Sequence, residues 1–293
     1  MIFNPDDFGV VGQGDDTLAI QGAINAVRQD GKGVIELRRA YNFGSLNATY
    51  CSNLEIECEI GAVHTCSALQ QPAVLLDLWR SHNVVINRLV VTGAQPGLSG
   101  IVYPKAALLL GKADKVTINN LTVNGTFSSG VFCDIGTGSV SVRDSQLINW
   151  DPSAPTVSLS NQPDWGITSL FANEPLSHMN MPDVFFDNTE IHQLGDAQWT
   201  TYLRNADHIT FRGGLSSNRQ RAHLLFQGQS KHVLCDSVKY YCELPGNAQM
   251  LYECGGGSSV TGMVVVNPSR DGIPILTGGT GSFPYFSVIP SQS

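Results

Sequence analysis

The strongest constraint on the fold of this chain is an internal repeat of short β-type segments. Seven apolar triplets recur along it: Val84-Val85-Ile86, Val116-Thr117-Ile118, Val140-Ser141-Val142, Val184-Phe185-Phe186, Ile209-Thr210-Phe211, Val233-Leu234-Cys235 and Val260-Thr261-Gly262. Their starts are 32, 24, 44, 25, 24 and 27 residues apart. Three of these intervals agree within one residue, and the longer ones are expected where insertions loop out of a repeating unit. The repeat therefore indicates a solenoid, in which each unit packs on its neighbours.

Each repeat contains three strands. A first apolar strand lies 7 to 9 residues before most triplets, as Leu108 to Leu110 does before Val116, and a polar corner joins the two. A third apolar stretch follows, such as Leu121-Thr122-Val123. Three strands in about 24 residues are typical of a parallel β-helix, whereas a propeller or sandwich needs antiparallel hairpins with tight Asn-Gly-type turns. We predict an all-β fold, a right-handed single-stranded parallel β-helix of about 8 to 9 coils.

One helix is expected near the start of the chain. Ile20, Ala23, Ile24 and Val27 follow the i, i+3, i+4, i+7 spacing of an apolar helix face. Asp15 or Asp16 can cap its first turn, and Asp30-Gly31 ends it. An amphipathic helix at the end of a solenoid covers the open edge of the first coil. We therefore divide the chain into an N-terminal segment with a capping helix (1–43), the coils (44–276) with a long loop at about 149–183, and a C-terminal cap or tail (277–293).

Composition excludes several classes of partner. The formal net charge is -8 and the sequence contains no block rich in Lys and Arg, so neither nucleic acid nor an anionic membrane is the expected partner. No apolar run reaches the roughly 18 to 20 residues that span a bilayer. Met1 leads directly into the polar stretch Asn4 to Asp7, so the printed sequence shows no secretion signal; we expect a protein that is not exported by that route, or one whose signal has been removed.

The cysteines suggest neither a metal site nor a full set of disulfides. Seven cysteines, an odd number, occur without Cys-x-x-Cys spacing. We expect most of them to be unpaired thiols inside the coils, where Cys behaves as a small apolar residue. We predict no metal and no cofactor.

The first 43 residues resemble a known family. Asp7-Phe8-Gly9, Gly14-Asp15-Asp16-Thr17, Ile20-Gln21 and Gly33-Val34 are similar to the N-terminal segment of the pectate-lyase-like β-helix superfamily, which includes polygalacturonases and bacteriophage tailspikes. Arg38-Arg39-Ala40 stands where that family usually has a Pro-Pro-Gly-like turn. The resemblance implies a carbohydrate-binding groove along one side, lined by residues just before and within the first strand of successive coils.

Fragments of the polygalacturonase motifs suggest catalytic residues. Leu194-Gly195-Asp196 resembles the Gly-Asp-Asp position without its second carboxylate, and His223 falls near the Gly-His-Gly position one coil later. Glycosidic cleavage needs a general acid, and inversion needs two carboxyl groups about 6.5 to 9.5 Å apart. Asp271, within Arg270-Asp271-Gly272, and Asp164 are candidates for the second carboxylate. Asp and His at coil corners also commonly serve only as hydrogen-bonding partners of the backbone.

Substrate-binding residues are expected near the long loop. It contains Trp150 and Trp165, and Trp199 lies in a nearby corner, where indole rings can stack on sugars or simply anchor the loop. Arg219 and Arg221, with Arg212, form the best local cluster of cations for an acidic ligand. We assign Trp150, Trp165, Trp199, Arg219 and Arg221 to substrate binding.

A second set of polar residues emerges when the triplets are aligned. The position three residues after each start reads Asn87, Asn119, Arg143, Asp187, Arg212 and Asp236. Asp187 and Asp236, two coils apart, also match the inverting distance. Alternating charge and Asn in one column is nevertheless what a stabilising ladder at a corner requires, because stacked like charges repel. We interpret this column as a ladder.

Two hypotheses for function remain. The first is a virion spike or fibre protein, similar to phage tailspikes, that binds a cell-surface polysaccharide and resides in the virion or outside the cell. The second is a polysaccharide depolymerase, a glycoside hydrolase or less readily a lyase. The resemblance to phage spikes implies a homotrimer in contact with other virion proteins, and the apolar tail Phe283 to Ile289 is either an end cap or a contact between subunits.

Overall fold

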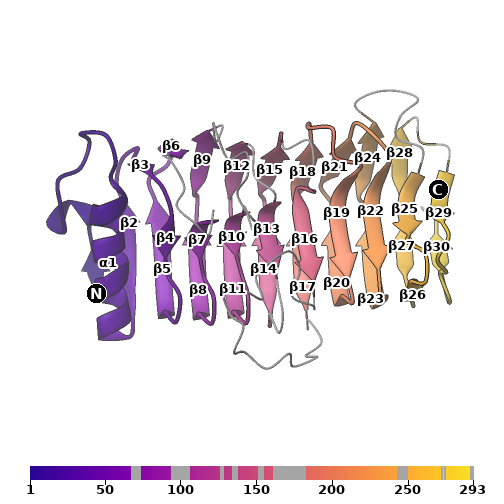
Figure 1. Cartoon of the computed structure of the whole chain (residues 1–293), viewed down its shortest axis with the longest axis horizontal. Helices are drawn as coiled ribbons and strands as arrows, with labels where there is room; N and C mark the ends of the chain where they lie inside the picture. Colours follow the sequence, from indigo (N-terminus) through magenta and orange to yellow (C-terminus); the bar gives the residue numbers. More distant parts are fainter. Residues whose placement is uncertain are drawn as a thin grey trace.

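The chain folds into an elongated solenoid of three parallel sheets that share one axis (Figure 1). The computed structural model describes residues 1–66, 74–93, 106–125, 129–133, 138–150, 155–160, 183–242, 250–271, 273 and 275–290. We call the three sheets A, B and C. Within the described residues each coil contributes one strand to sheet C, then one to sheet A and then one to sheet B. Every strand pairs in parallel with the equivalent strand of the next coil. This is the parallel β-helix that the three-strand repeat predicts, and the nine strands of sheets B and C agree with about 8 to 9 coils.

The strands of each sheet are short and ordered along the axis. Sheet A contains β1 (Ile2–Phe3), β2 (Gly33–Leu37), β5 (Ser52–Cys58), β8 (His82–Asn87), β11 (Asp114–Asn119), β14 (Val140–Arg143), β17 (Val184–Asp187), β20 (Asp207–Arg212), β23 (Gln229–Asp236), β26 (Ser259–Thr261), β27 (Val264–Val266) and β30 (Ser287–Ile289). Sheet B contains β3 (Asn42–Phe43), β6 (His64–Cys66), β9 (Val90–Gly93), β12 (Thr122–Gly125), β15 (Gln146–Asn149), β18 (Glu190–Gln193), β21 (Leu215–Asn218), β24 (Lys239–Cys242) and β28 (Ser269–Asp271). Sheet C contains β4 (Leu46–Asn47), β7 (Val74–Asp77), β10 (Ala106–Leu109), β13 (Ser129–Cys133), β16 (Val157–Ser160), β19 (Trp199–Arg204), β22 (Ala222–Gln227), β25 (Met250–Cys254) and β29 (Ile275–Gly279).

The interior is a continuous stack of apolar side chains. Along β11, Val116 and Ile118 point inward and are buried, whereas Thr117 between them points outward, as the two-residue period of a strand requires. The same inward position is filled in register by Val84, Val116, Val140, Val184, Ile209 and Val233. Because the repeat places β-branched residues above one another, each coil buries its neighbour's apolar face.

The helix lies where the apolar spacing predicts it. α1 (Thr17–Asp30) buries Ile20, Ala23, Ile24 and Val27 and ends at Gly31, which has a left-handed φ of 73°. Figure 1 shows α1 at the N-terminal end of the solenoid, beside β2. The short 3₁₀ helix η1 (Pro5–Asp7) packs against it. The helix thus covers the first coil, as a capping element should.

The expected long insert is interrupted by a strand. Within 149–183, β16 pairs with β13 on one side and with β19 on the other, so this stretch contributes a strand to sheet C. Residues 161–182 lie outside the described part of the chain. The sequence signal for this strand is the two-residue spacing of the apolar residues Val157 and Leu159. Both side chains are fully buried in the structure.

Two aromatic residues of the apolar tail pack on the interior of the solenoid. Phe283 and Phe286 pack against the core, and their ring centroids are 5.8 Å apart. Phe283 also meets Phe226, at 6.1 Å between centroids. Tyr285, Val288 and Ile289 of the same tail remain 82%, 41% and 50% exposed, so an end cap and a contact between subunits both stay predictions.

The aligned polar column is a ladder. Asn87, Asn119, Arg143, Asp187, Arg212 and Asp236 are successive register partners in sheet A. Asn119 Nδ2 donates to Asn87 Oδ1 at 2.9 Å, and Arg212 Nε lies 3.7 Å from Asp187 Oδ1. The ladder interpretation is therefore confirmed at these contacts.

Four of the described cysteines are buried free thiols: Cys51, Cys58, Cys235 and Cys254. Burial raises the pKa of Cys58 and of Cys235 to about 12, so both remain protonated at neutral pH. The prediction of unpaired interior thiols is confirmed for this set. No helix in the described part of the chain has the length and apolar character needed to cross a membrane.

Candidate functional site

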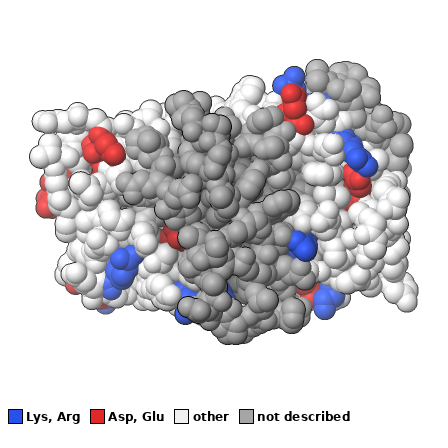
Figure 2. Space-filling model, viewed as in Figure 1, with Lys and Arg blue, Asp and Glu red and all other residues white. Residues whose placement is uncertain are grey.

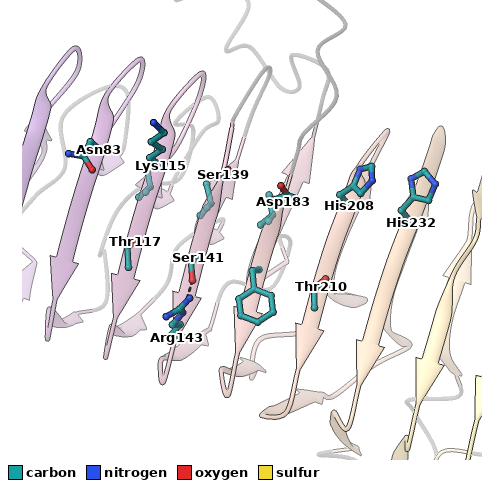
Figure 3. A pocket seen from close by; sticks show the side chains of 14 residues that line it. Asn83, Lys115, Thr117, Ser139, Ser141, Arg143, Asp183, His208, Thr210 and His232 are labelled. Carbon is teal, nitrogen blue, oxygen red and sulfur yellow. Dashed lines mark hydrogen bonds between the residues drawn. The ribbon is translucent and has the colours of Figure 1, made fainter.

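A groove with a volume of about 590 Å³ runs over the outer face of sheet A (Figure 3). Its lining comes from six strands or the residues just before them: β8, β11, β14, β17, β20 and β23. These strands are consecutive neighbours in the sheet. At about 4.8 Å per strand, the groove extends about 24 Å along the solenoid axis. Its long dimension therefore follows the direction in which the coils stack.

The floor of the groove is a single row of outward side chains. Thr117, Ser141, Phe185 and Thr210 are successive register partners, one from each of four strands. They point outward because they alternate with buried neighbours along each strand. The Arg212 guanidinium carbon lies 4.6 Å from the centroid of the Phe185 ring, a cation–π contact that holds the ring in place. The floor thus offers hydroxyl groups and one aromatic ring.

Charged residues line both margins of this floor. Lys115 and Asp183 are exposed on one margin, at equivalent positions in their coils, and Ser139 lies between them. On the other margin Arg143 is exposed and donates from Nε to Ser141 Oγ at 2.9 Å. Figure 3 shows Lys115 and Arg143 on opposite sides of the floor. A ligand in the groove would meet cations from both sides.

Five of the six residues along the first margin share an unusual backbone conformation. Asn83, Lys115, Asp183, His208 and His232 have left-handed φ values, between 52° and 56°, and Ser139 does not. Such values are uncommon outside glycine, although Asn, Asp and His tolerate them better than most residues. The repeat of this conformation in successive coils aligns their side chains along one edge of the groove (Figure 3).

At one end of the groove two imidazoles converge on one carboxylate. His208 Nδ1 and His232 Nδ1 lie 3.0 and 2.7 Å from the same oxygen, Asp207 Oδ1. Lys231 Nζ lies 3.2 Å from the other oxygen, Oδ2. The Asp207 side chain is buried, whereas more than half of each imidazole is exposed. The arrangement is a compact cluster of nitrogen and oxygen donors at the surface.

The predicted pair Asp196 and His223 is not brought together at the surface. Asp196 is exposed just before β19 and accepts a 3.4 Å hydrogen bond from Gln220 Nε2. His223 lies inside the solenoid with none of its surface exposed, and its Nδ1 is 2.8 Å from Ser216 Oγ. Burial lowers the pKa of His223 to about 3, so the imidazole is neutral. Successive residues of a strand point to opposite faces of the sheet, so a small shift in register decides whether His223 faces inward or outward. The sequence motif does not fix that register.

The candidates for a second carboxylate lie elsewhere. The backbone of Asp271 is in β28 of sheet B, where it pairs with Tyr241 of β24, whereas Asp196 leads into β19 of sheet C. Asp164 and Trp165 fall outside the described residues.

The predicted substrate-binding residues divide into two groups: Trp150 and Arg219 make separate contacts, whereas Trp199 and Arg221 share one partner. Trp150 is 49% exposed after β15, and its Nε1 donates to Asn124 Oδ1 at 2.9 Å. Arg219 Nη1 donates to the carbonyl of Leu194 at 2.7 Å, a contact that fixes a corner of the backbone.

Trp199 and Arg221 converge on a carboxylate that the sequence analysis missed. Trp199 Nε1 donates to Glu253 Oε2 at 2.9 Å, and Arg221 Nη2 lies 2.7 Å from Glu253 Oε1. The side chain of Glu253 is only 7% exposed. A single acidic residue within the apolar stretch Leu251 to Cys254 was the signal available in the sequence.

A perturbed carboxyl group lies on sheet C. Burial raises the pKa of Asp77, at the end of β7, to about 6, although the Trp79 backbone N–H donates to it at 2.9 Å and opposes the shift. A carboxyl group that holds its proton near neutral pH is suited to general acid chemistry.

The groove on sheet A was also missed, and a signal for it was present. The polar column aligned in the sequence is the position three residues after each triplet start, and this position forms the ladder. The middle position of the triplets, as in Thr117, Ser141 and Thr210, and the position just before them form the floor and margin. The family resemblance implies a groove lined by the first strand of each coil, and that strand belongs to sheet C.

Comparisons with known proteins identify the fold. No protein-family model matches the sequence, and no curated protein is significantly similar to it. Among solved structures, ORF18 of Geobacillus virus E2 is similar over 97% of this chain and 60% of its own, with 12% identity and a TM-score of 0.51. This chain therefore spans 60% of the length of the viral protein.

A second similar structure is an enzyme. The alginate lyase from Paenibacillus sp. str. FPU-7 matches over 96% of this chain and 99% of its own, with 11% identity and a TM-score of 0.51. At these identities the likeness concerns architecture and not chemistry. The chain thus has the right-handed parallel β-helix fold.

Proposed function

We propose that this protein binds a linear polysaccharide along the groove on sheet A. The observation that carries the proposal is the shape of the groove, which crosses six consecutive coils and follows the solenoid axis. A linear polymer matches such a site because its repeating units can meet equivalent positions of successive coils.

The lining has the chemistry that sugars require. Thr117, Ser141 and Thr210 supply hydroxyl groups that both donate and accept hydrogen bonds, and Phe185 supplies an aromatic surface. Lys115 and Arg143 are exposed and face the groove from its two margins. Because charge-assisted hydrogen bonds to carboxylates are stronger than neutral ones, these two cations favour a polysaccharide that carries acidic units.

The charges visible on one face of the molecule are mixed (Figure 2). In the view of Figure 2, Lys and Arg among the described residues lie scattered between Asp and Glu and form no single patch. Binding of an acidic polymer would then depend on the local cations of the groove, because the net charge of -8 repels polyanions overall.

We place this binding in a virion spike or fibre, as a homotrimer attached to other virion proteins. The similar fold of a Geobacillus virus protein supports a viral setting. Sedimentation equilibrium of the purified chain tests the oligomer directly. A mass near three times 31.5 kDa supports the trimer, and a monomer at all concentrations counts against it.

The second candidate is a depolymerase, and the raised pKa of Asp77 favours it. Hydrolysis needs a general acid and a second carboxylate. Asp77 is the protonated acid of this candidate. Asp196, exposed just before β19, is four strands away from β7, about 19 Å at about 4.8 Å per strand, so its predicted catalytic role with Asp271 or Asp164 is a separate proposal from that of Asp77. His223 has no part in this scheme, because it is buried inside the coil.

One incubation series tests both candidates. Purified protein is mixed with a panel of acidic and neutral bacterial surface polysaccharides, and binding, new reducing ends and absorbance of unsaturated products are followed. Binding without cleavage supports the spike. New reducing ends without unsaturation establish a hydrolase, and unsaturated products establish a lyase.

Variants then test the location. Lys115→Ala and Arg143→Ala are each expected to weaken binding of an acidic polysaccharide about tenfold, the effect of about 1.4 kcal/mol. Lys239→Ala removes the same charge from the exposed face of β24 in sheet B and should leave affinity unchanged. If both groove variants bind as tightly as the parent chain, the ligand lies on another face.

A further inference from the structure

We propose that Asp207, His208 and His232 form a binding site for a divalent transition-metal ion at one end of the groove. This site is independent of the polysaccharide proposal, because it rests on three donor groups and not on the length or lining of the groove.

The three donors already lie close together. One donor atom from each residue can be chosen so that all lie within 4.8 Å of one another. His208 Nδ1 and His232 Nδ1 are 3.0 and 2.7 Å from Asp207 Oδ1. Two ligands about 2.0 to 2.1 Å from a tetrahedral zinc ion lie roughly 3.3 Å apart, so only small side-chain movements are needed to admit the ion.

The coil repeat places these donors together. His208 and His232 are 24 residues apart and are equivalent residues of β20 and β23, as the register pair Ile209↔Val233 shows. Their ring centroids are 4.5 Å apart with an interplanar angle of 32°. Both have left-handed backbones, which direct the two rings to the same edge of the groove (Figure 3).

The donor set selects the class of ion. Two imidazole nitrogens and one carboxylate oxygen suit Zn²⁺, Co²⁺ or Ni²⁺, whereas Ca²⁺ and Mg²⁺ require mainly oxygen ligands. Three protein ligands leave a fourth position of a tetrahedral ion open. Since both imidazoles line the groove, that position would face it.

The surroundings of Asp207 prepare it to be a ligand. Its side chain is only 3% exposed, and both of its carboxylate oxygens have nitrogen partners. Lys231 Nζ holds Oδ2, at 3.2 Å, and leaves Oδ1 directed at the two imidazoles.

The same sheet contains a natural control. On β8 and β11, His82 Nδ1 lies 3.3 Å from Asp114 Oδ2, and the side chain of His82 is 49% exposed. His82 pairs in register with Asp114, as Asp207 pairs with Lys231. Asp114 has one imidazole partner where Asp207 has two, so the two sites differ in the number of nitrogen donors.

Calorimetric titration of the full chain with Zn²⁺ and with Co²⁺ tests the site. One ion per chain is expected, and His208→Ala and His232→Gln should each weaken binding at least about 100-fold, more than the loss of an outer-shell partner. His82→Ala should bind as the parent does. Thermal unfolding of each variant without metal verifies that the exposed substitutions leave the fold intact.

The cobalt spectrum provides a second readout. Visible bands of a tetrahedral Co²⁺ ion with nitrogen and oxygen ligands support the proposal. Thiolate-to-cobalt absorption would assign the ion to a cysteine and overturn it. Absence of binding, or equal binding by the parent, His208→Ala and His232→Gln, would overturn it as well.

Discussion

Trp199 and Glu253 are joined across two coils by a 2.9 Å hydrogen bond from the indole Nε1 to the carboxylate. Arg221, from the coil between them, holds the other carboxylate oxygen. Arg221→Ala should lower the free energy of unfolding by about 1 to 3 kcal/mol, because it leaves a buried carboxylate without its cation, a loss that solvent around the half-exposed Arg221 moderates. Arg219→Ala removes only a hydrogen bond to a carbonyl and should cost less than about 1 kcal/mol. Equal losses in urea unfolding would contradict the assignment.

His223 makes stability depend on pH. Its pKa is about 3 in the folded protein and 6.5 in a solvent-exposed chain. The unfolded chain therefore takes up a proton below pH 6.5 that the folded protein does not, and stability falls as the pH falls through this range. His223→Gln cannot titrate, so its loss of stability between pH 7 and pH 5 should be smaller than that of the parent by about 2 kcal/mol. Urea unfolding at the two pH values measures this, and parallel losses would refute it.

Asp77 has the opposite effect. Its pKa of about 6 in the folded protein exceeds the ordinary 3.8, so the folded carboxyl keeps its proton longer than the unfolded one. Ionisation then costs stability as the pH rises from about 4 to above 6. Asp77→Asn should raise the free energy of unfolding by about 3 kcal/mol at pH 8 and by less than about 1 kcal/mol at pH 4. The amide oxygen can still accept from the Trp79 N–H. A gain that is the same at both pH values would show that the cause is not ionisation.

Gly111 is required by close packing and not by its backbone angles. A Cβ at this position would lie 1.9 Å from the Trp79 ring. Trp79 is itself buried, so Gly111→Ala should destabilise the fold by about 1 to 3 kcal/mol through overpacking. Gly255→Ala is a matched control, since its nearest neighbour would be at 3.5 Å. Thermal unfolding of the two variants should differ clearly; similar midpoints would contradict the contact.

The fold was predictable because its repeat consists of apolar residues at regular spacing. The spacing of Val116, Val140 and Val184 reports directly on burial, and the ladder from Asn87 to Asp236 follows once the triplets are aligned. The direction of individual polar side chains was harder to infer. His223 and Glu253 both lie in strands of sheet C, yet one points into the coil and the other bonds Trp199 and Arg221 across coils. Such contacts depend on exact register between coils, which insertions of differing length obscure.

The groove on sheet A as a polysaccharide site is tested most directly by blocking its floor. Ser141→Trp places an indole in the centre of the groove, and Thr122→Trp places the same group on the outer face of β12 in sheet B. Binding of a polysaccharide that the parent chain recognises should be lost in Ser141→Trp and retained in Thr122→Trp, with both variants folded by circular dichroism. Undiminished binding by a folded Ser141→Trp variant would contradict the account.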